Sequence, residues 1–107
     1  MLRLEETWVL PEAVTPGNEV THRIRYAFCP AIPSGTFKGS IIRTVLFKGK
    51  KLFHTSTDYE FKPGTWIVDA FIGIPKEVKS GAYALEVVLK YADQTTKETK
   101  SFIVKGN

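Results

Sequence analysis

The side chains of this sequence that could act as nucleophile and base are one cysteine, Cys29, and two histidines, His22 and His54. A thiol becomes an effective nucleophile when a base lies beside it and a third group orients that base. No Cys-Gly or His-x-x-His spacing accompanies the three residues. His22 shares the apolar face of an expected strand, which is typical of a satisfied core or rim histidine, and His54 is expected to be exposed. We therefore expect a protein that is not an enzyme.

The acidic residues and the cysteine also offer no metal or cofactor motif. Asp58, Glu60, Asp69 and Asp93 lack the Asp-x-Asp-x-Asp spacing of a calcium loop. A single cysteine cannot form an internal disulfide or a multi-cysteine metal site. No glycine-rich phosphate loop and no Gly-x-Ser-x-Gly elbow is present. We expect no cofactor, while a site assembled from separate loops stays open.

Ile67, Asp69 and Phe71 share one face of an expected strand, with a carboxylate between two apolar side chains. One interpretation is a solvent-facing carboxylate that prevents wrong strand pairing. The other is an apolar patch with one polar anchor, which would suit a protein or sugar partner. Both interpretations remain open at this point.

A second candidate binding segment contains Leu52, His54 and Thr55, in a short expected strand at residues 52–57. The preceding Lys48-Gly49-Lys50-Lys51 predicts a hairpin turn with a solvated tip. A short strand with a polar end is typical of a sheet edge, and such an edge can pair with an extended segment of another chain. The lysines would favour an acidic partner, and the same edge could form a weak homodimer.

Period-two alternation of apolar and polar residues predicts seven strands, and no segment shows a helical period over three turns. In the third strand the apolar residues change parity near Ile41 and Ile42, which predicts a bulge or burial on both faces. The expected strands are residues 2–10, 19–29, 37–47, 52–57, 65–74, 83–91 and 96–104. The expected core residues are Leu4, Trp8, Ile24, Tyr26, Trp66, Val68, Tyr83, Leu85, Val87 and Leu89.

The stretch from Ile74-Pro75 through Gly81 to Tyr83-x-Leu85-x-Val87 resembles the immunoglobulin-like and fibronectin-type-III-like sandwich modules of bacterial and archaeal extracytoplasmic proteins. The resemblance implies an all-β, immunoglobulin-like antiparallel β-sandwich of about seven strands in two sheets with Greek-key topology, as one domain over residues 1–107. It also implies that the Tyr83 hydroxyl bonds to backbone within residues 76–79. The chain has no cysteine pair and no tryptophan on its third strand, so an antibody-type domain is not expected, and Trp66 is expected to fill the core instead.

The net charge of +4 and the pI near 9.3 raise the question of nucleic-acid binding. The cations are spread along the chain, and no basic positions alternate with aromatic ones on a strand, so nucleic acid is not the expected partner. No apolar run reaches the ~18 residues of a membrane span, and the first residues lack the apolar segment of a secretion signal. The protein is expected to be extracytoplasmic if the chain is an excised domain, and cytoplasmic otherwise.

These observations predict a noncatalytic β-sandwich interaction or spacer module within a larger or extracytoplasmic assembly, with a protein partner or neighbouring domains. The alternative is a carbohydrate-binding module. Such modules stack sugars on exposed aromatic rings, so this alternative requires several rings on one open face. The rings available are those of Trp8, Trp66, Tyr26, Tyr59 and Tyr91.

Overall fold

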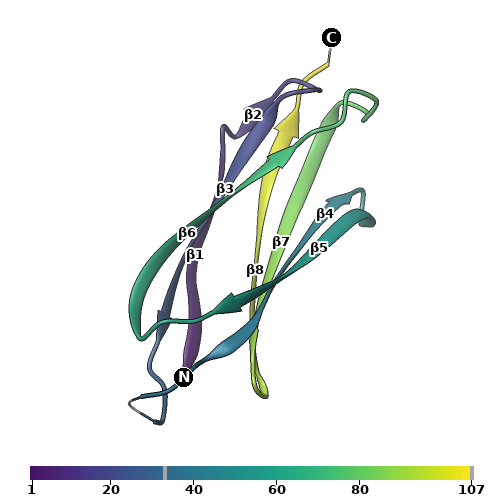
Figure 1. Cartoon of the computed structure of the whole chain (residues 1–107). Coiled ribbons are helices and arrows are strands. Elements are labelled where there is room, and N and C mark those ends of the chain that lie inside the picture. Colours follow the sequence, from purple (N-terminus) through teal and green to yellow (C-terminus); the bar gives the residue numbers. More distant parts are fainter. Residues whose placement is uncertain (33, 107) are drawn as a thin grey trace.

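The structure is a computed structural model that describes residues 1–32 and 34–106, and every regular element in these residues is a β-strand (Figure 1). None of the described residues belongs to a helix long and apolar enough to cross a membrane. Seven strands match the seven predicted from the sequence, and β2 is additional. The strands are β1 (Leu2–Leu10), β2 (Ala13–Val14), β3 (Glu19–Phe28), β4 (Lys38–Phe47), β5 (Lys50–Glu60), β6 (Gly64–Gly73), β7 (Gly81–Tyr91) and β8 (Gln94–Val104).

The strands form two packed sheets, one in the order β1-β3-β6 and the other in the order β2-β8-β7-β4-β5 (Figure 1). All neighbours are antiparallel except β2 and β8, which run parallel. The short β2 forms because the N–H of Ile103 donates to the carbonyl of Glu12, and the N–H of Lys105 donates to that of Val14. The predicted all-β fold with two sheets is confirmed, with one short parallel pair added.

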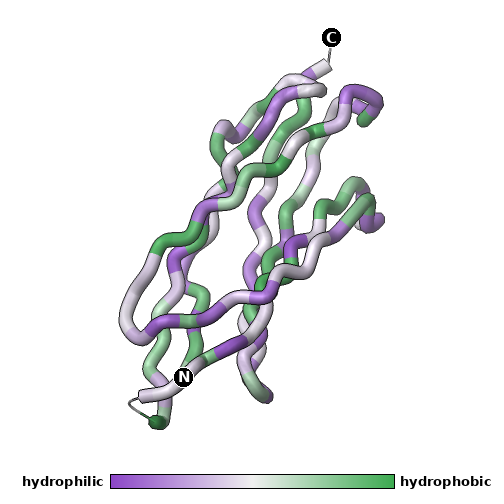
Figure 2. The backbone as a smooth tube through the Cα atoms, viewed as in Figure 1, coloured by the Kyte–Doolittle hydropathy of each residue, from purple (hydrophilic) through white to green (hydrophobic). Residues whose placement is uncertain are grey.

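The core lies between the two sheets, because each strand turns alternate side chains toward the other sheet. Figure 2 shows this alternation as apolar and polar segments along the strands. One apolar cluster gathers around Tyr26, Phe61 and Leu89, and a second gathers around Leu85 and Phe102. The predicted core residues that are buried are Leu4, Ile24, Tyr26, Tyr83, Leu85, Val87 and Leu89.

A β-bulge in β1 moves Trp8 out of the core. The pairing of β1 with β3 shifts between Leu4 and Glu6, so the inward parity passes from Leu4 to Thr7. Trp8 then lies on the outer face, half-buried, with its ring 5.9 Å from the Arg25 guanidinium carbon. The prediction that Trp8 fills the core is wrong because an inserted residue reverses every later side chain of a strand.

Trp66 is also outside the core, with 43% of its surface exposed. It lies near the start of β6, the edge strand of its sheet, where neighbours cover it from one side only. Its Nε1 donates to the carbonyl of Pro63 at 2.9 Å, and Lys62 Nζ lies 5.4 Å from its ring. The predicted core role of Trp66 is therefore wrong, and Val68 two residues later is only partly buried against the core.

The sandwich is closed along the side where β1 meets β8. The N–H of Leu2 donates to Gln94 Oε1 at 2.7 Å, and the N–H of Leu4 donates to Thr96 Oγ1 at 3.3 Å. On the opposite side, β5 and β6 are edge strands of different sheets, and no ladder joins them in the described residues. Phe61, in the link between these two strands, is buried, and its N–H donates to the carbonyl of Phe37 at 2.8 Å. The sandwich is thus open between β5 and β6.

Candidate functional site

A groove of about 360 Å³ lies along this open side. Its walls come from both sheets, because β4 and β5 of the five-stranded sheet line one side and β6 of the three-stranded sheet lines the other. Inward-facing residues of β5 are cross-strand partners of inward-facing residues of β4, and such partners share a face. Thr55 pairs with Arg43 in this way, and Phe53 pairs with Val45. The groove is lined by Arg43, Val45, Phe53, Thr55, Thr57, Ala70, Phe71, Ile72 and Gly73.

Three buried polar side chains cross the core beside the groove. Arg43 Nε donates to His22 Nδ1 at 2.9 Å, and His22 Nε2 lies 2.8 Å from Thr7 Oγ1. An arginine is always a donor, so His22 Nδ1 must be the acceptor and the imidazole proton must sit on Nε2. His22 therefore donates to Thr7. The expectation that His22 is a satisfied core histidine is confirmed.

Burial and the contact between His22 and Arg43 determine the protonation state of each side chain. His22 is 0% exposed, and its burial together with the nearby Arg43 charge lowers its pKa from 6.5 to about 4. Burial also lowers the pKa of Arg43 from its ordinary value, which is high enough that the guanidinium stays protonated at neutral pH. The core therefore holds one positive charge at Arg43 beside a neutral His22.

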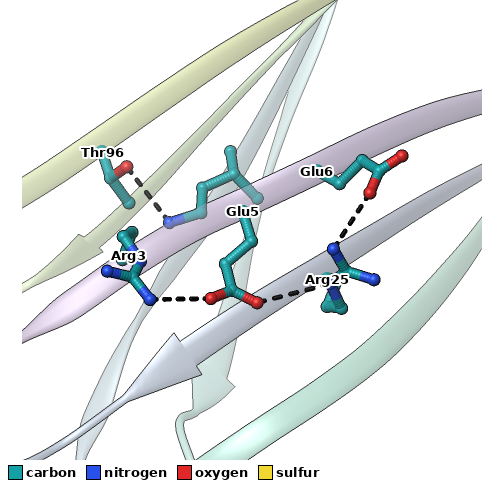
Figure 3. A network of polar contacts seen from close by, with 6 residues as sticks. Arg3, Glu5, Glu6, Arg25 and Thr96 are labelled. Carbon is teal, nitrogen blue, oxygen red and sulfur yellow. Dashed lines mark hydrogen bonds and ion pairs between the residues drawn. The ribbon is translucent and has the colours of Figure 1, made fainter.

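No carboxylate in the described residues pairs with Arg43. The four ion pairs found there all lie on the outer face of the three-stranded sheet, and none includes Arg43. Three of them form the network in Figure 3, where Glu5 lies between Arg3 and Arg25, and Arg25 also reaches Glu6. The exposed arginines thus have partners, and the buried one does not.

The free part of the Arg43 guanidinium is its outer edge, away from His22. Its two terminal nitrogens have no hydrogen-bond partner among the described residues. No side-chain nitrogen or oxygen there is both fully buried and unpaired. These two nitrogens must therefore keep contact with solvent, and the groove that Arg43 lines supplies it. The arrangement is a cation 8% exposed at the floor of a groove, positioned by His22 and open to a ligand.

Each of the two binding segments expected from the sequence, residues 52–55 and residues 67–71, contributes one residue to the lining of this groove. Thr55 lines it from β5 and Phe71 lines it from β6. His54 is exposed on the other face of β5, as expected. Leu52 lies at a bulge of β5 and lines a separate hollow of about 430 Å³ beside Tyr83.

Asp69 is not a free anchor for a partner. Arg23, its direct neighbour on β3, donates to both of its carboxylate oxygens, at 2.8 and 2.9 Å. The same guanidinium lowers the pKa of Asp69 from its ordinary value. Ile67 and Phe71 beside it are 60% and 68% exposed. The patch is therefore two exposed apolar side chains beside an ion pair within the sheet.

The aromatic residues considered for sugar binding do not share an open face. Tyr26 is fully buried, and Tyr59 and Tyr91 pack against the core around it. Trp8 lies on the outer face of β1, whereas Trp66 lies near the start of β6. This geometry does not favour the carbohydrate alternative.

The other residues considered for catalysis or metal binding do not form a site comparable to the groove at Arg43. Cys29 is exposed beyond the end of β3. Within residues 1–32 and 34–106, no three His, Cys, Asp or Glu side chains gather in a way that could hold a metal ion. The Tyr83 hydroxyl donates to the carbonyl of Lys79, which is the kind of backbone contact that the family resemblance implies.

No protein-family model and no curated protein matches this chain. Among solved structures, the chain is similar to the crystal structure of Spo0M, a sporulation control protein from Bacillus subtilis. The TM-score is 0.74 at 10% sequence identity, and the match covers 99% of this chain and 50% of that chain. At this identity the similarity establishes the fold alone. This chain spans half of the Spo0M chain.

Arg43 is a functional candidate that the sequence pattern did not reveal. The expected change of parity near Ile41 and Ile42 left its direction undefined. In the structure, Ile41, Arg43 and Val45 all face inward. Thr44 on the opposite face is also buried, in agreement with the expected burial on both faces, and a bulge lies in the pairing of β4 with β5 near Val45 and Leu46. An arginine between two apolar residues of one parity was the signal that could have identified it.

Proposed function

We propose that this protein is a noncatalytic interaction module that binds an extended segment of a partner protein along the free edge of β5. The observation that supports this most directly is that β5, 11 residues long, pairs with β4 on one side only and is exposed at every residue except Tyr59. A long strand with one unpaired edge can accept a further strand by main-chain hydrogen bonds.

The residues around β5 favour binding of an acidic protein segment at its free edge. Lys50 and Lys51 begin the strand and repel a second basic edge, so they favour an acidic segment. The groove beside the strand offers the apolar Phe53 and Ile72 to inward side chains of an added strand. Main-chain bonds would provide affinity, and the groove would provide specificity.

The immunoglobulin-like Greek-key classification and an extracytoplasmic or spacer role belong to the same proposal. The Tyr83 contact with Lys79 supports the classification, because it matches the tyrosine corner of such sandwiches. A weak homodimer through β5 would be the self-complementary version of the same pairing.

Two adjacent proline variants test the edge. Successive N–H groups of a strand point to opposite edges, so of Thr55 and Ser56 one donates toward β4 and the other points outward. Thr55→Pro and Ser56→Pro should therefore differ: one should lower the free energy of unfolding strongly, and the other should leave it nearly unchanged. Urea unfolding of both variants identifies the outward position.

The stable proline variant then reports on binding. Peptides selected from a random twelve-residue phage library on the wild-type protein should slow hydrogen exchange at the outward amides of residues 50–60. The stable variant should no longer bind these peptides, although it keeps its fold. If the outward amides are already strongly protected in the isolated monomer, or if no peptide that protects them is selected, the proposed function is wrong.

A further inference from the structure

We propose that Arg43 is the anion-binding residue of this groove, and that it receives the carboxylate of one aspartate or glutamate in the segment bound along β5. This inference rests on the function proposed above and names the chemistry of its partner.

The first reason is the uncompensated charge. A buried ion is unfavourable unless another charge and hydrogen bonds replace its hydration, and Arg43 is 8% exposed with a neutral imidazole as its side-chain partner. A carboxylate entering the groove would supply the missing negative charge. Because the surroundings are largely removed from water, the interaction would be much stronger than an ion pair on the surface.

The second reason is the orientation of the guanidinium. The bond from Nε to His22 fixes one edge of the planar group, and His22 is itself held by Thr7. The two terminal nitrogens are left without a partner among the described residues, and their N–H groups form a fork that suits bidentate binding of a carboxylate. The site is already ordered before a ligand arrives, so little side-chain freedom is lost on binding.

The third reason is access from the edges. On β5 the cross-strand partner of Arg43 is Thr55, and on β6 the cross-strand partner of His22 is Ala70. Both are small side chains, and both line the groove together with Arg43. A strand added to β5 would place its inward residue beside Thr55, with its Cα about 10 Å from that of Arg43, two strand spacings away. The side chains of a glutamate and an arginine together span this separation.

The walls of the groove also predict the residues that flank the acid. Along β5 the inward neighbours of Thr55 are Phe53 and Thr57, and both line the groove. An inward residue two positions from the acid would therefore contact apolar surface on the Phe53 side and a hydroxyl group on the Thr57 side. A basic residue at the central position would face the Arg43 charge and is disfavoured. The preferred segment therefore has one acidic residue and, two positions away on the Phe53 side, an apolar residue of the same parity.

The test uses the selected peptides and a double-mutant cycle. We expect one acidic residue to recur at a fixed position, and its replacement by glutamine or asparagine should weaken binding about ten- to a hundredfold, as for a charge-assisted pair. With Arg43→Met as the receptor, the acidic and amide peptides should bind equally. Arg43→Lys should restore only part of the difference, because lysine lacks the fork. Peptides that bind along β5 with no acid preference would overturn this inference and leave the proposed function intact.

A second measurement does not depend on peptides. The ¹⁵N resonances of the Arg43 side chain should move on titration with succinate, a free dicarboxylate, and should not move with the neutral succinamide. Ala70→Leu, which fills the access between the strands, should reduce this response, whereas Ala82→Leu on the exposed face of β7 should not. Movement with succinate but no peptide binding would reject the proposed function and retain the anion site. No movement with succinate would overturn the anion site.

Discussion

His22 makes the stability of this protein depend on pH. Its pKa is about 4 in the folded state against 6.5 ordinarily, so between these values the unfolded chain binds the additional proton. The contribution of neutral His22 to the free energy of unfolding is therefore fully present above pH 6.5, and it decreases as the pH falls toward 4. The expected loss from this residue is about 3 kcal/mol near pH 4, measured by urea unfolding at several pH values.

The control for this effect is His22→Gln, which retains polar atoms at this position and does not titrate. The surface carboxylates contribute to both proteins alike, so the difference in pH dependence isolates His22. Thr7 and Arg43 are the side chains that bond to His22, and neither changes charge in this range. An equal loss of stability in wild type and variant would contradict a neutral, buried His22.

The hydroxyl of Tyr83 should contribute measurably to the free energy of unfolding. Tyr83→Phe keeps the ring in the core and removes the bond to the Lys79 carbonyl, so the free energy of unfolding should fall by about 1 to 3 kcal/mol. Tyr91→Phe is the matched control, because the Tyr91 hydroxyl has no hydrogen bond among the described residues. Equal denaturation midpoints for the two variants would argue against a tyrosine corner.

Among the strand glycines, Gly39 of β4 has the least room for a side chain. A Cβ at Gly39 would lie 2.1 Å from the Lys90 carbonyl oxygen and 2.7 Å from Phe61 Cε2. Gly39→Ala should therefore cost about 3 kcal/mol or more in chemical denaturation, because backbone and core must shift. Gly73→Ala on β6 meets nothing within 4 Å and should be nearly neutral. A small effect at Gly39 would mean that β4 and β7 separate easily.

The strands were largely predictable, because alternation over eight or more residues is a strong local signal. Their side-chain directions were less predictable. The bulge in β1 depends on its pairing with β3, and only after that pairing is known does Trp8 point outward. The prediction for β5 was too short, since the strand is exposed on both faces and has no apolar alternation beyond Phe53.

The Arg43 groove could not be derived from sequence for a related reason. It arises where two edge strands of different sheets diverge, and local patterns do not say which strands become edges. Alternation placed His22 inward, but the contact with Arg43 joins the two sheets across the core. Such a contact becomes visible only when the sheets are packed.

At the scale of the whole molecule, the open side should govern self-association. We expect weak dimers at millimolar concentration, and sedimentation equilibrium should show them weakening as salt rises from about 0.02 to about 0.5 M. The reason is that an antiparallel pair of β5 strands places Lys50 and Lys51 of one copy beside Asp58 and Glu60 of the other, and salt screens this attraction. The stable proline variant of β5 should remain monomeric. Dimers that strengthen with salt would indicate an apolar contact elsewhere.

The direction of the first and last strands has a mechanical consequence. The two ends of the chain lie at opposite ends of the molecule, whose dimensions are 52 × 22 × 17 Å (Figure 1). Tension between residues 1 and 106 would run along β1 and β8, at right angles to the hydrogen bonds that join them to β3 and β7. Those bonds would be loaded in shear and would have to break together, whereas a peeling force breaks them one by one. Within a spacer, such a module would resist stretching.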